Sequence, residues 1–302
     1  MLGSAQRTVG WAACAWAARA GIAGAGRNAK LLAMILTSVP LGHVLLSLAA
    51  ALAYAVPAVG AARLSPGASR GALLAAWLLH AAVLAWGLWG SAPRFGFAPA
   101  LSVTAWLVLT VYAVESRMFP QLRARWALAA LGAVAVLLAL AFPGTPTHLA
   151  ASPWLPLHWA LGIASYGLFA AAVVHAWLMT RAEKRIRQAA DSASGVPLLT
   201  LERLTFRFVA AGFVLLSATL LAGMLFSETL YGPQVRAWKW DHKTVFSLLA
   251  WLSFAILLAG RSRFGWRGRT AKRVLYAGAV LLLLAYVGSR FVLEVVLHRP
   301  VA

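Results

Sequence analysis

The chain has 302 residues, of which 62% are hydrophobic and only 11% are charged, and its formal net charge is +20. Soluble domains carry about 25% charged residues, so this composition excludes an ordinary soluble fold, whose surface needs more polar side chains. The basic residues stand in short clusters between apolar runs, which is typical of membrane-protein loops and disfavours nucleic acid as a partner. A single cysteine, Cys14, excludes an intrachain disulfide and a CxxC motif.

The first part of the chain, residues 1–37, does not read as a spanning helix. It is rich in Ala, Gly and Arg and contains no clean apolar stretch of about 20 residues, and its features are also poor for a cleaved signal. We expect this part to be a leader outside the membrane domain, with Met34 as the candidate for the true start.

Eight apolar runs follow, separated by turn formers such as Ser65-Pro66-Gly67 and Pro143-Gly144. A spanning helix needs about 20 mostly apolar residues. The predicted spans lie near residues 38–62, 71–90, 99–116, 126–142, 156–180, 207–227, 244–260 and 272–298. The sequence therefore predicts an all-α, polytopic membrane domain over residues 38–298, with about eight transmembrane helices in one bundle and no soluble domain.

The distribution of Lys and Arg predicts the orientation of the bundle. Most of these residues after residue 38 lie in alternate loops, at 63–70, 117–125, 181–206 and 261–271. The positive-inside rule places these loops in the cytoplasm. Both ends of the eight-helix bundle are therefore predicted to lie on the outer side of the cell inner membrane. Residues 181–206 are predicted to form a basic, partly helical loop.

The seven histidines differ in their predicted depth. The topology places His43, His158, His242 and His298 at outer helix ends, His148 in an outer loop, His80 near mid-membrane and His175 toward the cytoplasm. A neutral imidazole is a good ligand for haem iron, although an isolated interfacial histidine is more often simply solvated. The number of histidines on the outer side favours a ligand role for some of them.

Two further segments carry charge next to aromatic residues. The run Trp238-Lys239-Trp240-Asp241-His242-Lys243 stands at the entrance of the seventh span, where indoles can stack on a porphyrin and cations can pair with its propionates. In the last span, Arg290 and Glu294 are four residues apart and can form an ion pair on one helix face. A propionate clamp at Arg290 is the alternative interpretation.

Other motifs complete a pattern. They are Leu157-His158 with Ser165-Tyr166, the run Leu201 to Arg207, Ala250-Trp251, Gly265-Trp266-Arg267-Gly268, and Tyr286-Val287-Gly288 followed by Ser289-Arg290. Together with the tryptophan-rich run, they resemble the cytochrome c assembly protein family, membrane haem handlers that include CcsA and CcmC. The smaller HemX/YpjD-like subgroup matches best, over about residues 38–298. Compared with the larger members, the tryptophan motif is shorter and has His242 at its proline position.

The resemblance implies a membrane protein of cytochrome c assembly that binds haem non-covalently near the outer face. Its implied partners are the lipid bilayer, haem and other cytochrome c assembly proteins. By this resemblance His158 is one axial ligand of the haem iron, and His298 or His242 is the other. The remaining implied haem-binding residues are Trp238, Trp240 and Asp241 of the tryptophan motif, and His80, which binds haem in transit or serves the bundle. Arg290, Lys239 or Lys243 is implied to lie near the propionates.

Two other functions stay open at this point. The first is a membrane regulator of haem biosynthesis that carries no haem, and the second is a transporter of another small molecule. Intramembrane charges are few and no inverted repeat is evident, which disfavours the transporter. The sequence contains no recognisable nucleophile–base–orienter set and no phosphate loop, so it does not predict an enzyme.

Overall fold

The computed structural model describes residues 39–60, 63–89, 94–118, 125–146, 154–188, 197–231 and 240–292. The chain divides into two compact units, Met1–Leu45 and Leu46–Ala302. In the first unit the described residues are the beginning of one helix, and the predicted leader with Met34 lies outside them. The second unit contains everything that follows.

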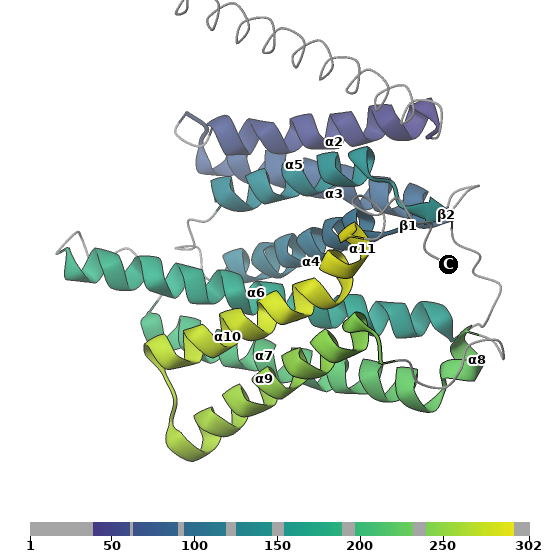
Figure 1. The fold of residues 1–302 in the computed structure, drawn as a ribbon. Coiled ribbons are helices and arrows are strands. Elements are labelled where there is room, and N and C mark those ends of the chain that lie inside the picture. The colour runs from purple at the N-terminus through teal and green to yellow at the C-terminus, as the bar shows by residue number, and fades with distance from the viewer. Residues whose placement is uncertain are drawn as a thin grey trace, which may run out of the picture. The chain divides into compact units, whose positions relative to one another are not determined.

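The described residues are almost entirely helical (Figure 1). The helices are α2 (Leu41–Val59), α3 (Pro66–Trp89), α4 (Phe97–Met118), α5 (Arg125–Ala141), α6 (Leu155–Arg187), α7 (Leu198–Leu225), α8 (Ser227–Tyr231), α9 (His242–Phe264), α10 (Gly268–Leu283) and α11 (Ser289–Phe291). A π-helical turn, η4 (Leu284–Gly288), joins α10 to α11, and two short strands, β1 (Arg94–Phe95) and β2 (Thr145–Pro146), precede α4 and α6.

Length and composition make this a membrane protein. In the described part of the chain, seven helical segments are long and apolar enough to span a bilayer, namely α2, α3, α4, α6, α7, α9 and the continuous run Gly268–Phe291. A shorter apolar helix, Ala127–Ala141, is the eighth. The prediction of an all-α polytopic protein with about eight membrane helices is therefore confirmed.

Two helices extend beyond their predicted membrane spans into the loop at 181–206, which was predicted to be partly helical. α6 has 33 residues and α7 has 28. At about 1.5 Å per residue, α6 is roughly 50 Å long, well beyond a hydrocarbon core of about 30 Å. Much of the loop predicted at 181–206 is therefore helix. Its Arg, Lys and Glu residues have high helix propensity, so the helices continue where the chain leaves the hydrocarbon.

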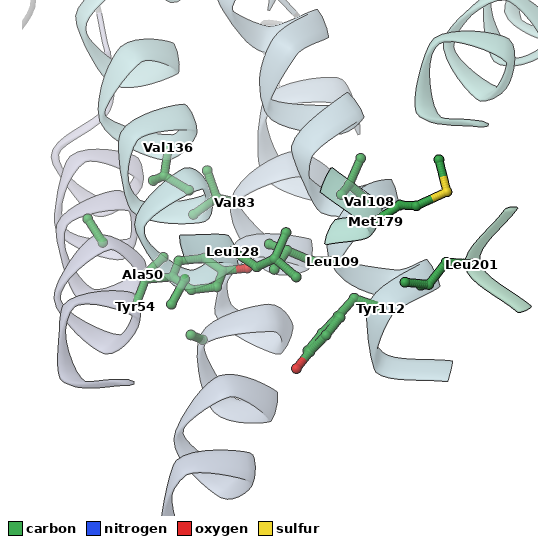
Figure 2. Packing of buried hydrophobic residues seen from close by; sticks show 13 residues of the cluster. Ala50, Tyr54, Val83, Val108, Leu109, Tyr112, Leu128, Val136, Met179 and Leu201 are labelled. Carbon is green, nitrogen blue, oxygen red and sulfur yellow. The ribbon is translucent and has the colours of Figure 1, made fainter. Parts of the chain in front are cut away.

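Buried apolar side chains form two clusters. The first comes from α2 to α5, with Met179 of α6 and Leu201 of α7 added to it. Figure 2 shows Tyr54, Leu109 and Leu128 of this cluster, which come from three different helices. The second cluster lies among α6, α7, α9 and α10, around the stacked rings of Phe169 and Phe254, whose centroids are 3.7 Å apart. α6 thus takes part in both clusters.

Small residues let the helices approach closely, as is usual where lipid replaces water around a bundle. A Cβ at Gly167 of α6 would lie 2.9 Å from Cδ1 of Leu107 in α4. A Cβ at Gly278 of α10 would lie 2.8 Å from the Phe254 ring of α9. The absence of a side chain at these two positions sets the spacing of both helix pairs.

The two strands tie together connections that are distant in sequence. β1 pairs antiparallel with β2, with Arg94 opposite Pro146 and Phe95 opposite Thr145. Gly144 has a φ of 78° and lies against the Phe95 carbonyl, where a Cβ would approach to 2.5 Å. We call the end of the bundle that carries β1, β2, α11 and the first turns of α6 and α9 the strand end (Figure 1).

The opposite, basic end contains the turn between α9 and α10. Gly265 ends α9 with a φ of 63°, a left-handed conformation that glycine adopts without cost, and Trp266 packs over Gly260. Glu202 of α7 lies 2.6 Å from Nη1 of Arg261 and 3.4 Å from Nε of Arg267. The ion pairs of Glu202 thus join the Gly-Trp-Arg-Gly motif to the Leu-Glu-Arg-Leu run and hold the turn between α9 and α10 against α7.

Candidate functional site

Two cations lie near one aromatic ring at the strand end. Nζ of Lys243, in the first turn of α9, and Cζ of Arg290, in α11, each lie 5.9 Å from the centroid of the Tyr286 ring in η4. This distance is within the roughly 6 Å range of cation–π attraction. Lys243 also interacts electrostatically with His158 of α6 and with Arg290. The last membrane helix and α9 therefore bring a guanidinium and an ammonium to Tyr286, and the imidazole of α6 lies within electrostatic range of the ammonium.

An aromatic wall extends this group toward β1. The ring of Phe95 stacks on Trp159 of α6, with centroids 5.3 Å apart and planes 10° apart. The same ring lies 6.3 Å from Tyr286. Because β1 is held by β2, Phe95 sits in a fixed place between the start of α6 and the last helix. The site thus combines positive charge with flat apolar surfaces.

His158 is half-buried in the first turn of α6, where its backbone N–H donates a hydrogen bond to the carbonyl of Trp154. Pro156 also stands in this turn, where a missing N–H costs no intrahelical bond. Gly223 of α7 faces the imidazole: a Cβ there would lie 3.4 Å from Cε1 and 4.0 Å from Nε2. Because Gly223 has no side chain, the imidazole edge with Cε1 and Nε2 lies next to the backbone of α7.

Asp241 determines where α9 begins. Its Oδ1 accepts a hydrogen bond of 2.8 Å from the backbone N–H of Thr244, which makes Asp241 the N-cap residue. The cap fixes the first turn and with it the position of Lys243. Trp240 is 73% exposed, and His242 is also exposed. The Asp of the tryptophan motif therefore has a structural role as the N-cap of α9.

His80 lies in the first cluster, with both ring nitrogens in hydrogen bonds. The Tyr54 hydroxyl is 3.1 Å from Nδ1, and Oγ of Ser102 is 2.8 Å from Nε2. All three side chains are fully buried, and a buried imidazole needs such partners. To bind a haem in transit, His80 would have to break one of these hydrogen bonds. The arrangement therefore favours the interpretation that His80 stabilises the bundle.

Other predicted residues fall beyond the described ranges. They are Trp238, His298, Lys239, His148 and Glu294. The second axial ligand and the Arg290–Glu294 ion pair therefore stay predictions.

A buried polar pair that the sequence did not predict joins α4 to α6. Nε2 of His175 lies 2.8 Å from Oε2 of Glu115, and the two side chains are 4% and 7% exposed. Nδ1 of His175 is 2.8 Å from the Ala171 carbonyl, which can only accept, so Nδ1 carries a proton. The sequence placed His175 toward the cytoplasm but gave no sign of Glu115 as its partner.

The grouping around Tyr286 also went unrecognised in the sequence, where Tyr286 appeared only as the first residue of a Tyr-Val-Gly motif. A signal was present in the neighbouring Arg290 and in Lys243 of the tryptophan motif. What the residues could not show is that α9 packs against the π-helical turn that carries Tyr286, and that Phe95 lies between Trp159 of α6 and Tyr286. Phe95 and Trp159 were missed for the same reason.

Apolar helices of spanning length, with an imidazole, two cations and an aromatic wall at one end, define a polytopic membrane protein with a candidate site for a flat, anionic ligand. Residues 69–297 match the family model described as Cytochrome C assembly protein. The chain therefore belongs to this family, as its motifs predicted.

Curated relatives agree with this assignment. The chain is 33% identical over 152 residues to Inner membrane protein YpjD of Escherichia coli (strain K12), which covers 50% of this chain and 56% of that protein. It is 36% identical over 149 residues to a 28.8 kDa protein of Azospirillum brasilense, covering 48% and 53%. It is 32% identical over 95 residues to Cytochrome c biogenesis protein CcsA of Gloeobacter violaceus, covering 32% and 27%. The chain spans about half the length of the first two relatives.

Proposed function

We propose that the protein binds haem non-covalently at the strand end of its bundle and serves cytochrome c assembly in the inner membrane. The observation that carries the proposal is that Lys243 and Arg290 both approach the Tyr286 ring, with His158 of α6 within electrostatic range of Lys243. Family membership and the printed names of CcsA and YpjD support the biological setting. Other cytochrome c assembly proteins and the lipid bilayer are the proposed partners.

The residues of the site fit the chemistry of haem. Haem offers an iron that accepts imidazole nitrogen, an apolar ring and two carboxylates. His158 supplies the imidazole, with His298 or His242 as the proposed second ligand. Lys243 and Arg290 repel each other, and an anion between them relieves that repulsion and gains charge-assisted hydrogen bonds. Trp238 and Trp240 are proposed to cover the ring.

A haem titration of the purified full-length protein tests the proposal. Haemin added to the protein in lipid nanodiscs should give a Soret band characteristic of imidazole ligation, which saturates near equimolar haem. Empty nanodiscs are the control, because haem partitions into lipid. Identical spectra with and without protein would reject haem binding and leave the membrane regulator, or a transporter of another molecule, as the alternative.

We further propose that the strand end faces outward and the basic end faces the cytoplasm. In a Cys14→Ser background, cysteines at the exposed positions Ser65 and Ser262 should resist an impermeant thiol reagent in intact cells. A cysteine at Thr229, in α8 near the strand end, should react. Ser69 is a poor labelling position, because it is buried in the structure. The reverse labelling pattern would place the candidate site in the cytoplasm.

A further inference from the structure

The last membrane helix changes its winding immediately before the site. Residues Leu284–Gly288 form a π-helical turn between α10 and α11. Such turns are rare, because their hydrogen bonds run from residue i to i+5 and the turn contains an extra residue. They persist where other contacts offset their cost, and they are frequent at functional sites.

Side-chain hydroxyls hold the turn from both sides. Tyr166 of α6 donates a hydrogen bond of 2.6 Å to the carbonyl of Leu282, two residues before the turn. Ser289, just after the turn, lies with its Oγ 3.0 Å from the carbonyls of Ala285 and Tyr286. The Tyr166 contact comes from a different helix, so it anchors the turn to α6, the helix that also carries His158.

The turn decides which way Arg290 faces. Each residue of an α-helix advances the helix by about 100°, so one extra residue rotates everything beyond it by about that angle. Without the π turn, Arg290 would leave the side of the helix that faces Lys243. Tyr286 lies within the turn itself, and its ring is the group that both cations approach. The cation–aromatic arrangement therefore depends on the winding of five residues.

We propose that Tyr166 is a positioning residue for this anion site: its hydroxyl bond to Leu282 holds the π turn that aims Arg290 and Tyr286 at Lys243. The identity of the anion, the carboxylates of haem, rests on the proposed function. The role of Tyr166 in the winding of the helix does not.

The test compares Tyr166→Phe with Tyr276→Phe in the full-length protein. The control removes a hydroxyl from α10 that bonds Thr180, away from the π turn. Amide hydrogen exchange over residues 282–291, measured without haem, should be faster in Tyr166→Phe and unchanged in Tyr276→Phe. Ser289→Ala, which removes the bonds on the other side of the turn, should resemble Tyr166→Phe. Unchanged exchange in Tyr166→Phe would overturn the proposed positioning role.

A second readout uses haem and its dimethyl ester, in which the carboxylates are blocked. Tyr166→Phe should bind haem about tenfold more weakly than the wild type, which corresponds to the loss of a good hydrogen bond. Its affinity for the ester and its Soret position should not change, because His158 is untouched. Equal affinities of Tyr166→Phe and wild type for haem would overturn the proposal. If the wild type binds neither compound, the proposed function fails, and the exchange experiment still decides the role of Tyr166.

Discussion

Replacing His158 by alanine is expected to remove the imidazole-type Soret band and to lower the haem affinity of the purified protein by at least about tenfold. His158 begins α6 within electrostatic range of Lys243, whose ammonium approaches the same Tyr286 ring as Arg290. Free imidazole added to His158→Ala should restore the band, because it can occupy the space that the deleted ring leaves. Absorption spectra and haem content per protein measure both effects.

Trp240→Phe provides the matched control for this prediction. Trp240 is 73% exposed at the start of α9, so the change keeps an aromatic face and leaves the proposed iron ligand in place. Haem should be retained less well, with the same spectrum. Should a folded His158→Ala variant keep wild-type haem content and spectrum, His158 is not a ligand, and the role implied by the family motif is wrong at that residue.

The second large effect is expected at the buried pair between α4 and α6. His175→Leu leaves the Glu115 carboxylate buried without its partner, and breaking such a pair costs about 3–5 kcal/mol of folding free energy. The double variant Glu115→Leu/His175→Leu removes both buried polar side chains and should recover most of this loss. Unfolding of the wild type, the two single variants His175→Leu and Glu115→Leu, and the double variant in the same detergent, followed by tryptophan fluorescence, gives the comparison.

The ion pair of Lys272 with Glu183 is the control for that experiment. Its partners lie 2.9 Å apart but are 11% and 28% exposed, so Glu183→Gln should cost much less than His175→Leu. A double Leu variant as unstable as the sum of the two single Leu variants would show that Glu115 and His175 contribute independently and not as a pair.

The number and type of the helices could be predicted because bilayer thickness fixes how many apolar residues a span needs. The ends of α6 and α7 could not, since a helix that leaves the membrane needs no apolar residues to continue. The short helix α5, with 17 residues, was recognised all the same, because its run is uninterrupted. Composition therefore located the spans and indicated a partly helical loop at 181–206, while the residues at which α6 ends and α7 begins became visible only in the structure.

The candidate site was predicted in its residues and not in its arrangement. His158, Lys243 and Arg290 were each identified from motifs, but the sequence does not show which helix ends are neighbours. The sequence does not reveal the π turn, because the apolar periodicity over five residues cannot distinguish i+4 from i+5 hydrogen bonding. Glu115 was overlooked as a lone carboxylate near the end of a span, and only the position of His175 across the helix interface shows what it does.

The two apolar clusters also bear on how the protein is made. Helices α2 to α5 leave the ribosome first and can pack in the bilayer as they emerge. Their cluster is incomplete at that stage, because Met179 and Leu201 arrive with α6 and α7. The second cluster cannot close until Phe254 and Leu275 have been synthesised. The order of synthesis therefore allows the helices to pack in two successive steps, with α6 and α7 completing the first cluster and beginning the second.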